Sequence, residues 1–495
     1  MPKRVVKLLN EYGPMLSGEL SRKMEQEFGI SNIAARKALS RAKNPVNKIA
    51  VLSFDKNQKF FYLESQFNSQ LYIDRLMGAI ESSSLIIWSY ICAFRAQNGY
   101  VAKDLLPALV SSPVQNIKGH KTHQQIVDGL LKCQIIEEYN ETHWMLSDWI
   151  MVQNRSFARS IGIETVKKQV VNDFVHWARN INLIGYDSAK TFTNSAEFAH
   201  FHWAVTAPSY IQPLYDIEQQ KPGFVIVDIF YGHVAKIEDV RFFLDKLSVI
   251  RAFKNLPTIM PVLLVESVTI ETLKELKNSK VTVALIKNIF DPKYTELLAE
   301  IVNIFSYSSA IIAKNPKKIE VLFGEIAKAE GRYNDIIGDM FELLIGYYYH
   351  HIGCRYLELK RMIRVPDSDE RREIDVLVER DGEIIIVECK ATRSAIDKAF
   401  VDKWLSQNIP KIRMWLLERY SYGKKFRFQL WSLGGFTEEA HKTLHLAASA
   451  AKKYNIEFFE KKEIIDMAKN QNVQTVVDIL QQHFHPPLEA VLKHD

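Results

Sequence analysis

Apolar positions in the first 64 residues follow a helical period three times and then a strand-like alternation twice. The helical period predicts three helices, over Arg4–Glu11, Leu16–Phe28 and Asn32–Lys43. Ser31 stands directly before the third helix and is a good N-cap. The alternating segments Ile49–Phe54 and Phe60–Glu64 predict two strands joined by a polar turn. The N-terminal region is therefore expected to be a small unit of three helices and a hairpin.

This order of elements is typical of a winged helix-turn-helix. In that fold the third helix enters the DNA major groove and the hairpin, or wing, touches phosphates. We therefore predict DNA contacts from the polar face of the third helix and from the wing tip, through Asn32, Arg36, Lys37, Ser40, Arg41, Lys43, Lys56 and Lys59. The alternative is a winged helix that acts as a protein–protein spacer, with the same residues forming a solvated face.

Residues 67–150 repeat this plan in a weaker form. Helical patterns at Leu71–Arg95 and His123–Cys133 precede two short strand patterns at Ile135–Tyr139 and His143–Leu146. The second copy lacks a basic third helix, because its polar face carries His123, Gln124, Gln125 and Asp128. A structural spacer is therefore favoured over a second DNA reader.

Residues 151–310 are expected to be a helical linker followed by a Rossmann-like domain. Residues 155–215 look mainly helical. Three apolar runs without alternation follow, each succeeded by a helical segment, at Phe224–Ile229, Ile259–Val265 and Val281–Ile286. This rhythm predicts a parallel sheet that is covered on both faces. Asp228 stands at the carboxyl end of the first run, where such sheets bind ligands. A scaffold or dimerisation surface is favoured, and a sensor for a small nucleotide is the alternative.

The charge of the chain is concentrated at its N-terminus. The whole protein has 64 Lys and Arg against 58 Asp and Glu, a net charge of +6. Residues 1–65 alone have 12 basic and 6 acidic residues, which accounts for the whole excess. A basic module on a neutral body indicates nucleic acid or an acidic membrane surface as its partner.

Cysteine spacing and hydropathy indicate a cytoplasmic protein with no membrane segment. The four cysteines lie far apart with no CxxC spacing, so neither a disulfide framework nor a structural zinc site is expected. The N-terminus is too polar for a signal peptide. The longest apolar stretch, Leu85–Phe94, is far shorter than the ~18 residues of a membrane helix.

The segment 336–390 carries the candidate chemistry. A helix is predicted over Ile336–His350, and Glu342 lies within it. A strand follows over Tyr356–Ile363. Two further strands, Glu373–Arg380 and Glu383–Lys390, flank Asp381-Gly382, a dipeptide that favours a two-residue hairpin turn.

This turn fixes the register of the hairpin. If Asp381 and Gly382 form the turn, the numbers of opposite residues sum to 763, and Asp375 lies directly opposite Glu388. Their Cβ atoms are then about 5 Å apart on one face of the sheet. Lys390, two residues after Glu388, points to the same face. The residues therefore predict two carboxylates and one lysine in a single cluster.

Two adjacent carboxylates at the ends of apolar strands suit a hard divalent cation such as Mg²⁺. The metal ligands would be Asp375, Glu388 and the backbone carbonyl of Cys389, whose thiol faces away. Such a cation stabilises the charge of phosphoryl transfer and activates a water, and Lys390 would orient that water or stabilise the developing charge. The alternative is a salt-bridged hairpin that exists for folding reasons alone.

Asp375, twelve intervening residues, and then Glu388-Cys-Lys390, after a helix with Glu342, resemble the PD-(D/E)XK nuclease superfamily. The resemblance implies an αβββαβ core, cleavage of DNA and less often of RNA, and Mg²⁺ or Mn²⁺ as cofactor. It makes Asp375, Glu388, Lys390 and Glu342 the catalytic residues. The usual proline before the first aspartate is replaced by Ile374.

The same resemblance extends beyond the hairpin. It assigns the helix Ser394–Trp404 and the strand Phe426–Trp431 to the core. It also implies an accessory polar role for Gln407. Basic side chains of this part would face the DNA backbone, namely Lys398, Lys403, Lys411 and Arg413.

The sequence thus predicts a multidomain α/β protein. Its parts are a winged helix (1–66), a second winged-helix-like domain (67–150), a linker with a Rossmann-like parallel-sheet domain (151–310), a restriction-endonuclease-like αβββαβ core (311–440) and a helical tail (441–495). The predicted activity is metal-dependent DNA hydrolysis by a homodimer, in defence, restriction or mobile-element biology.

Two other functions compete with this prediction. One is a non-catalytic DNA-binding regulator with a relic nuclease fold. The other is a nuclease gated by a nucleotide second messenger. The second follows from a resemblance of the core to CRISPR-ancillary proteins that join it to a Rossmann-like sensor. In those proteins the sensor comes first, whereas two winged helices come first here.

Overall fold

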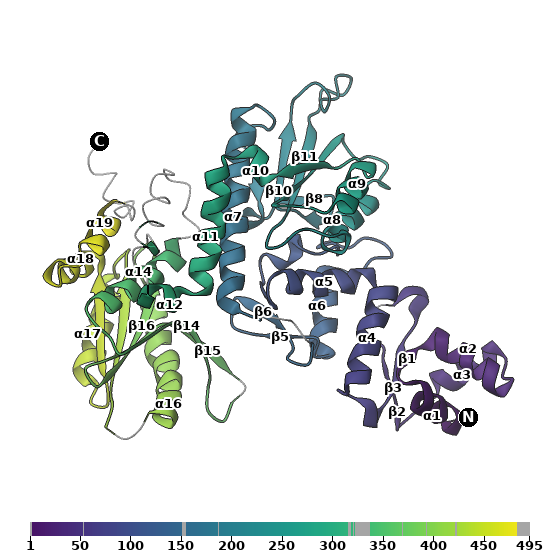
Figure 1. The fold of residues 1–495 in the computed structure, drawn as a ribbon, viewed down its shortest axis with the longest axis horizontal. Coiled ribbons are helices and arrows are strands. Elements are labelled where there is room, and N and C mark those ends of the chain that lie inside the picture. Colours follow the sequence, from purple (N-terminus) through teal and green to yellow (C-terminus); the bar gives the residue numbers. More distant parts are fainter. Residues whose placement is uncertain are drawn as a thin grey trace. The chain divides into compact units, whose positions relative to one another are not determined.

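The structure is a computed structural model that describes residues 2–52, 54–150, 155–186, 188–314, 318–319, 321, 337–368, 370–392, 394–420 and 423–482. The chain divides into two compact units, Met1–Asp291 and Pro292–Asp495. Both combine helices with small β-sheets, so the protein is a mixed α/β chain (Figure 1). The division falls before the predicted end of the Rossmann-like domain at residue 310.

The first 66 residues form three helices and a three-stranded sheet. The elements are α1 (Pro2–Tyr12), β1 (Met15–Leu16), α2 (Ser17–Phe28), α3 (Asn32–Ser40), β2 (Val46–Ile49) and β3 (Phe60–Leu63), and the strand order is β1-β3-β2. Ser31 caps α3 by accepting a hydrogen bond from the Ala34 N–H, as predicted. The first strand of the hairpin lies earlier than predicted, because Val46 pairs with Leu63 and both side chains are buried.

Residues 67–150 contain one helix more than predicted. The elements are α4 (Gln70–Ser83), α5 (Leu85–Ala96), β4 (Tyr100–Ala102), α6 (His123–Lys132), β5 (Ile136–Glu138) and β6 (His143–Leu146). The predicted continuous helix Leu71–Arg95 is wrong, since the chain bends by 117° at Ser84. Ser84 leaves the helical conformation there, and its carbonyl accepts the Trp88 N–H that starts α5.

The bent pair α4 and α5 also answers the membrane question as far as the structure describes the chain. No single described helix is long and apolar enough to cross a bilayer, and only this pair passes the criterion by combined length and composition. Most of the side chains of α5 are buried within the protein.

Residues 155–291 form a five-stranded sheet with helices against it. The elements are α7 (Phe157–Asn180), β7 (Lys190–Thr191), β8 (Glu197–Phe198), β9 (Phe201–His202), β10 (Val205–Ser209), β11 (Gly223–Phe230), α8 (Ile237–Ile250), β12 (Ile259–Val265), α9 (Ile270–Asn278), β13 (Thr282–Leu285) and α10 (Ile286–Ile289). The sheet order is β13-β12-β11-β10-β7. The three predicted strands are parallel, but β10 and β7 join them antiparallel. The prediction that residues 155–215 are mainly helical is therefore wrong after α7.

Buried polar contacts connect the predicted second and third domains. The carboxylate of Glu164 on α7 accepts hydrogen bonds from the Ala102 N–H at 2.9 Å and from Gln97 at 3.3 Å, and it lies 3.2 Å from His143 Nε2. All of these partners precede residue 150. Because a buried carboxylate needs its hydrogen bonds, residues 67–150 and 155–291 share one interior.

The second unit is built on a five-stranded sheet of order β14-β15-β16-β17-β18. Its elements are α11 (Pro292–Ser306), α12 (Ser308–Lys314), α14 (Ile337–His351), β14 (Tyr356–Arg364), β15 (Arg371–Arg380), β16 (Glu383–Lys390), α15 (Lys398–Lys403), α16 (Ile409–Arg419), β17 (Lys425–Ser432), α17 (Glu438–Ala450), β18 (Asn455–Glu460), α18 (Lys461–Asn470) and α19 (Gln474–Gln482). The first three strands are antiparallel neighbours, and β17 and β18 are parallel to β16. The segment predicted as a helical tail thus contributes strand β18 to this sheet.

Helices pack on both faces of this sheet. Ile384, Ile386 and Phe428 belong to a core with side chains of α15, α16 and α17. Residues of opposite parity face α14, where Trp431 contacts the rings of Tyr348 and Tyr349. The carboxyl end of β16 therefore lies between two helical layers.

A π-helical turn, Trp404–Asn408, joins α15 to α16, so the predicted helix that starts at Ser394 begins later and runs on to Arg419. Pro410 explains the turn, because it has no N–H for the normal hydrogen bond and its ring displaces the preceding carbonyl. The same helix places Phe400 beside the end of β16.

Candidate active site

The hairpin β15–β16 has the predicted register. Asp381 and Gly382 both have positive φ, 52° and 79°, as a two-residue hairpin turn requires. Arg380 pairs with Glu383, and this pairing continues to Val376 and Val387. The next pair along the same register is Asp375 with Glu388, so the predicted juxtaposition of these two carboxylates is present.

Asp375 is held by the backbone of the neighbouring strand. One oxygen of its carboxylate accepts a 2.7 Å hydrogen bond from the Cys389 N–H. The pKa of Asp375 is raised to about 7, first by burial and then by the Glu388 carboxylate, against the opposing effects of Lys390 and of the Cys389 N–H. The pocket therefore disfavours the charged form of Asp375 unless a cation enters it.

Lys390 forms an ion pair with Glu388 at the end of β16. Its Nζ lies 2.7 Å from Glu388 Oε1, and the two side chains are 30% and 15% exposed. The ammonium also lies 5.2 Å from the centre of the Phe400 ring. Burial lowers the pKa of Lys390, but the Glu388 and Asp375 carboxylates outweigh this effect and raise it above its ordinary value. Lys390 is therefore a fixed positive charge beside two carboxylates, which favours a role in charge stabilisation over one as a base.

Glu342 reaches the same region from α14, but it has a partner of its own. Lys360 Nζ lies 2.7 Å from Glu342 Oε2, and these side chains are only 11% and 14% exposed. Burial raises the pKa of the Cys389 thiol, as do the charges of Asp375 and Glu342, which places Glu342 near the end of β16. The sequence analysis missed Lys360, since a lysine in a strand carries no motif.

The donor set fits a hard divalent cation bound with few protein ligands. The described residues contain no group of three or more His, Cys, Asp or Glu side chains arranged to hold a metal. Asp375 and Glu388 supply two carboxylates, whereas the charge of Glu342 is compensated by Lys360. Mg²⁺ commonly binds proteins through one or two carboxylates and keeps several waters. The predicted role of the Cys389 carbonyl stays a prediction.

Other basic residues assigned to DNA in this unit are partly engaged elsewhere. Lys398 Nζ lies 2.6 Å from the Asp402 carboxylate, and Lys411 Nζ lies 2.8 Å from that of Glu370. Gln407 is exposed within the π-helical turn. The contacts of these residues with nucleic acid remain predictions.

The predicted DNA-binding residues of the first unit lie on a small exposed surface. The helix α3 ends at Ser40, so Arg41 and Lys43 follow it and do not belong to it as predicted. Ser40 donates a hydrogen bond to the Lys37 carbonyl. Lys56 lies at the hairpin tip with a φ of 56°. All eight predicted residues are exposed except Asn32, which is half-buried. The sequence analysis missed Lys48, whose Nζ lies 3.3 Å from the Ser40 carbonyl and adds a charge beside α3.

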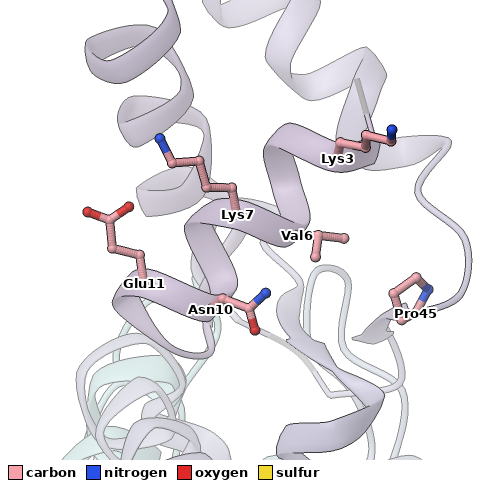
Figure 2. A pocket seen from close by; sticks show the side chains of 6 residues that line it. All are labelled: Lys3, Val6, Lys7, Asn10, Glu11 and Pro45. Carbon is pink, nitrogen blue, oxygen red and sulfur yellow. The ribbon is translucent and has the colours of Figure 1, made fainter.

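A hollow in the same part of the chain has no comparable chemistry. It measures about 690 Å³, and Lys3, Val6, Lys7, Asn10 and Glu11 of α1 line it together with Pro45 (Figure 2). Figure 2 shows Val6 between α1 and Pro45, with Lys7 and Glu11 on the opposite side of the helix. Its lining holds a single carboxylate and no lysine–carboxylate cluster.

Asp228, the predicted ligand position of the parallel sheet, is used inside the protein. Its carboxylate accepts hydrogen bonds from the Ala204 N–H and from Lys246 Nζ, both at 2.9 Å. Lys246 also donates to the carbonyls of Ala108 and His202, at 2.7 and 2.8 Å. Both side chains are almost fully buried. This arrangement favours the scaffold over the ligand sensor at this residue.

Comparisons with known proteins do not assign a family. No family model and no curated protein matches the chain. One solved structure that resembles part of it is a crystal structure of a protein of unknown function, at 18% sequence identity and a TM-score of 0.18. The match covers 25% of this chain and 55% of that protein, so the chain spans about half of its length. A likeness this weak carries no argument about function.

Proposed function

We propose that the second unit is a divalent-metal-dependent nuclease that hydrolyses DNA, and that the first 66 residues bring it to its substrate. The observation that carries this proposal is the cluster of Asp375, Glu388 and Lys390. Two carboxylates and a lysine meet at the end of two paired strands, and Lys390 lies 2.7 Å from Glu388.

The order of elements supports the proposal. The sequence α14-β14-β15-β16-α15/α16-β17 follows the αβββαβ order that the resemblance to PD-(D/E)XK nucleases implies. Three helices with a three-stranded sheet in residues 1–66 are compatible with a winged helix, and the parallel strands β11–β13 with a Rossmann-like domain. The exposed basic residues around α3 suit phosphate contacts.

The energetic state of the pocket argues against a purely structural ion pair. A carboxylate that stabilises a fold by pairing has its pKa lowered, whereas that of Asp375 is raised to about 7. The cluster therefore costs stability at neutral pH. Residues that cost stability in a pocket are typical of catalytic sites.

The side chains of this unit have defined roles in the proposed reaction. Asp375 and Glu388 would hold Mg²⁺ or Mn²⁺, which when bound supplies charge stabilisation and lowers the pKa of the attacking water. The Cys389 N–H fixes the orientation of Asp375. Glu388 and the Phe400 ring fix the ammonium of Lys390, whose positive charge stabilises the negative charge that develops at the scissile phosphate.

Cleavage assays on the full chain test this function. Wild type and Lys390→Ala are incubated with supercoiled, linear and single-stranded DNA, and with RNA, in the presence of Mg²⁺ or Mn²⁺. Wild type is expected to cut DNA, and Lys390→Ala to cut at least about 100-fold more slowly, because the loss of one preorganised charge contact costs about 10²–10³ in rate.

Lys424→Ala is the matched control for this experiment. Lys424 Nζ lies 2.7 Å from Glu379 at the opposite end of the same hairpin, so the variant also breaks a lysine–glutamate pair. It should cut at the wild-type rate. Equal cutting by wild type and Lys390→Ala would remove Lys390 from the mechanism, and a wild type that cuts no nucleic acid with either metal would contradict the proposed function.

A further inference from the structure

The strand β14 contains a residue in a conformation that strands rarely adopt. Lys360 has a φ of 52°, in the left-handed region that disfavours residues with a side chain. The pairing with β15 is regular on both sides, since Leu359 pairs with Val376 and Arg361 with Ile374. The position between these pairs holds Lys360 and Asp375. The distortion is therefore local, and it lies opposite the centre of the acidic pocket.

This conformation changes which face of the sheet the strand presents. Leu359 packs against Gly346 of α14, where an added Cβ would lie 2.8 Å from Leu359 Cδ2. Arg361 lies on the other side, 6.0 Å from the Trp415 ring of α16. In a regular strand these two residues face the same side. The left-handed residue therefore reverses the strand, and it directs its own side chain to Glu342 on α14.

The ion pair that results alters the charge of the pocket. Glu342, Asp375 and Glu388 contribute three negative charges, and Lys360 and Lys390 contribute two positive ones. Without Lys360 the same side chains carry a net charge of −2 in place of −1. Strained residues persist only where the surrounding structure imposes them, and they gather at functional sites.

We propose that Lys360 is a positioning residue that neutralises Glu342, so that the pocket binds a single divalent cation through Asp375 and Glu388. This inference rests on the proposed function, because it concerns the same pocket. With one divalent cation bound, the five side chains and the metal carry a net charge of +1, which suits a phosphodiester anion. A second cation would need the Glu342 carboxylate, and Lys360 occupies it.

Mn²⁺ binding to the full chain, followed by electron paramagnetic resonance and calorimetry, tests the proposal without an activity assay. Wild type should bind one Mn²⁺ that Asp375→Asn abolishes. Lys360→Gly, which suits the left-handed backbone and removes the ammonium, should bind a second Mn²⁺ or bind the first at least about tenfold more tightly. Lys360→Arg, which keeps the charge, should behave as wild type.

Two variants separate charge from backbone effects. Asp381→Gly changes another non-glycine residue with a φ of 52°, at the hairpin turn, and should leave Mn²⁺ binding unchanged. The double variant Lys360→Gly/Glu342→Gln removes both members of the ion pair and should return to one Mn²⁺. It also leaves no uncompensated Glu342 if Lys360→Gly alone folds poorly.

The outcomes distinguish this inference from the proposed function. If Lys360→Gly and the double variant bind Mn²⁺ with wild-type stoichiometry and affinity, Lys360 does not set the metal content, while loss of binding in Asp375→Asn would still support the nuclease pocket. If wild type and all variants bind no Mn²⁺, both proposals are overturned.

Discussion

Two lysine–carboxylate arrangements, one in each unit, differ in what the protein gains from them. Asp228 and Lys246 in the first unit are almost fully buried, and the Lys246 ammonium donates to three oxygen atoms. The acidic pocket of the second unit is partly open, and Asp375 there has a raised pKa beside a second carboxylate. A buried pair with complete hydrogen bonding serves the fold, whereas a cluster with excess negative charge serves a ligand.

The largest effect is expected at the interior pair. Asp228→Asn leaves the buried Lys246 ammonium without its counter-charge, and breaking one partner of a buried ion pair costs about 3–5 kcal/mol. The free energy of unfolding should fall by this amount in a denaturant titration that follows Trp203, whose ring lies 4.8 Å from Lys246 Nζ. The double variant Asp228→Asn/Lys246→Met should recover much of the loss. An Asp228→Asn protein as stable as wild type would end the contrast between the two units.

A pH titration of stability tests the interior of the first unit in a second way. Burial lowers the pKa of His123 to about 4, with a smaller contribution from His202. Its Nδ1 lies 2.8 Å from the Tyr90 hydroxyl. The unfolded chain takes up a proton below its ordinary pKa of about 6.5, whereas the folded chain does so only near 4. Stability is therefore complete above pH 6.5 and falls between 6.5 and 4.

The expected loss across this window is about 2 kcal/mol, since each pKa unit corresponds to 1.36 kcal/mol and the ring is only partly buried. His123→Gln has no proton to take up, so its stability should vary less over the same range. Parallel curves for wild type and His123→Gln would show that His123 titrates alike in the folded and unfolded chain.

Exposed charges should affect binding but not stability. Arg36→Ala/Lys37→Ala removes two exposed cations of α3, so the affinity for DNA should fall about tenfold or more, and the slope of log affinity against log salt should decrease by about 2. Lys274→Ala/Lys277→Ala, on the exposed side of α9, is the control with the same charge change. Equal effects of the two double variants would remove α3 from the DNA interface.

The smallest effect has the opposite sign. Asp375→Asn should raise the free energy of unfolding by about 1 kcal/mol in EDTA at pH 8, because it removes one of two neighbouring carboxylates and leaves an oxygen to accept the Cys389 N–H. The same variant should abolish metal-dependent cleavage. Asp402→Asn, at a carboxylate paired with Lys398, is the control. A clear loss of stability in Asp375→Asn would assign the cluster to the fold.

Local signals explain which parts of the site could be predicted. Asp381-Gly382 specifies a turn with two positive φ values, and the alternation of β15 and β16 then determines that Asp375 lies opposite Glu388. The ion pair of Lys390 with Glu388 follows from their spacing along the strand. Nothing in the sequence marks Lys360, because its left-handed conformation is imposed by packing against α14 and α16.

The elements that were missed lacked a local signal in the same way. The strands β7, β8 and β9 have two residues each, too short for an alternation to be visible. The strand β18 is held by pairing with β17, and its sequence Asn455–Glu460 has few β-branched residues. The break at Ser84 separates two segments that share a helical period, so only their packing decides it.

The hydrogen bond from Lys246 to the Ala108 carbonyl has a practical consequence for dividing this protein into fragments. A fragment that starts after residue 150 would remove Ala108 from the buried ammonium, and it would also remove the Ala102 and His143 partners of Glu164. Expression trials of the parallel-sheet region should therefore begin near residue 67 and end near residue 291. Fragments with that start should give soluble, cooperatively unfolding material, and shorter ones should aggregate.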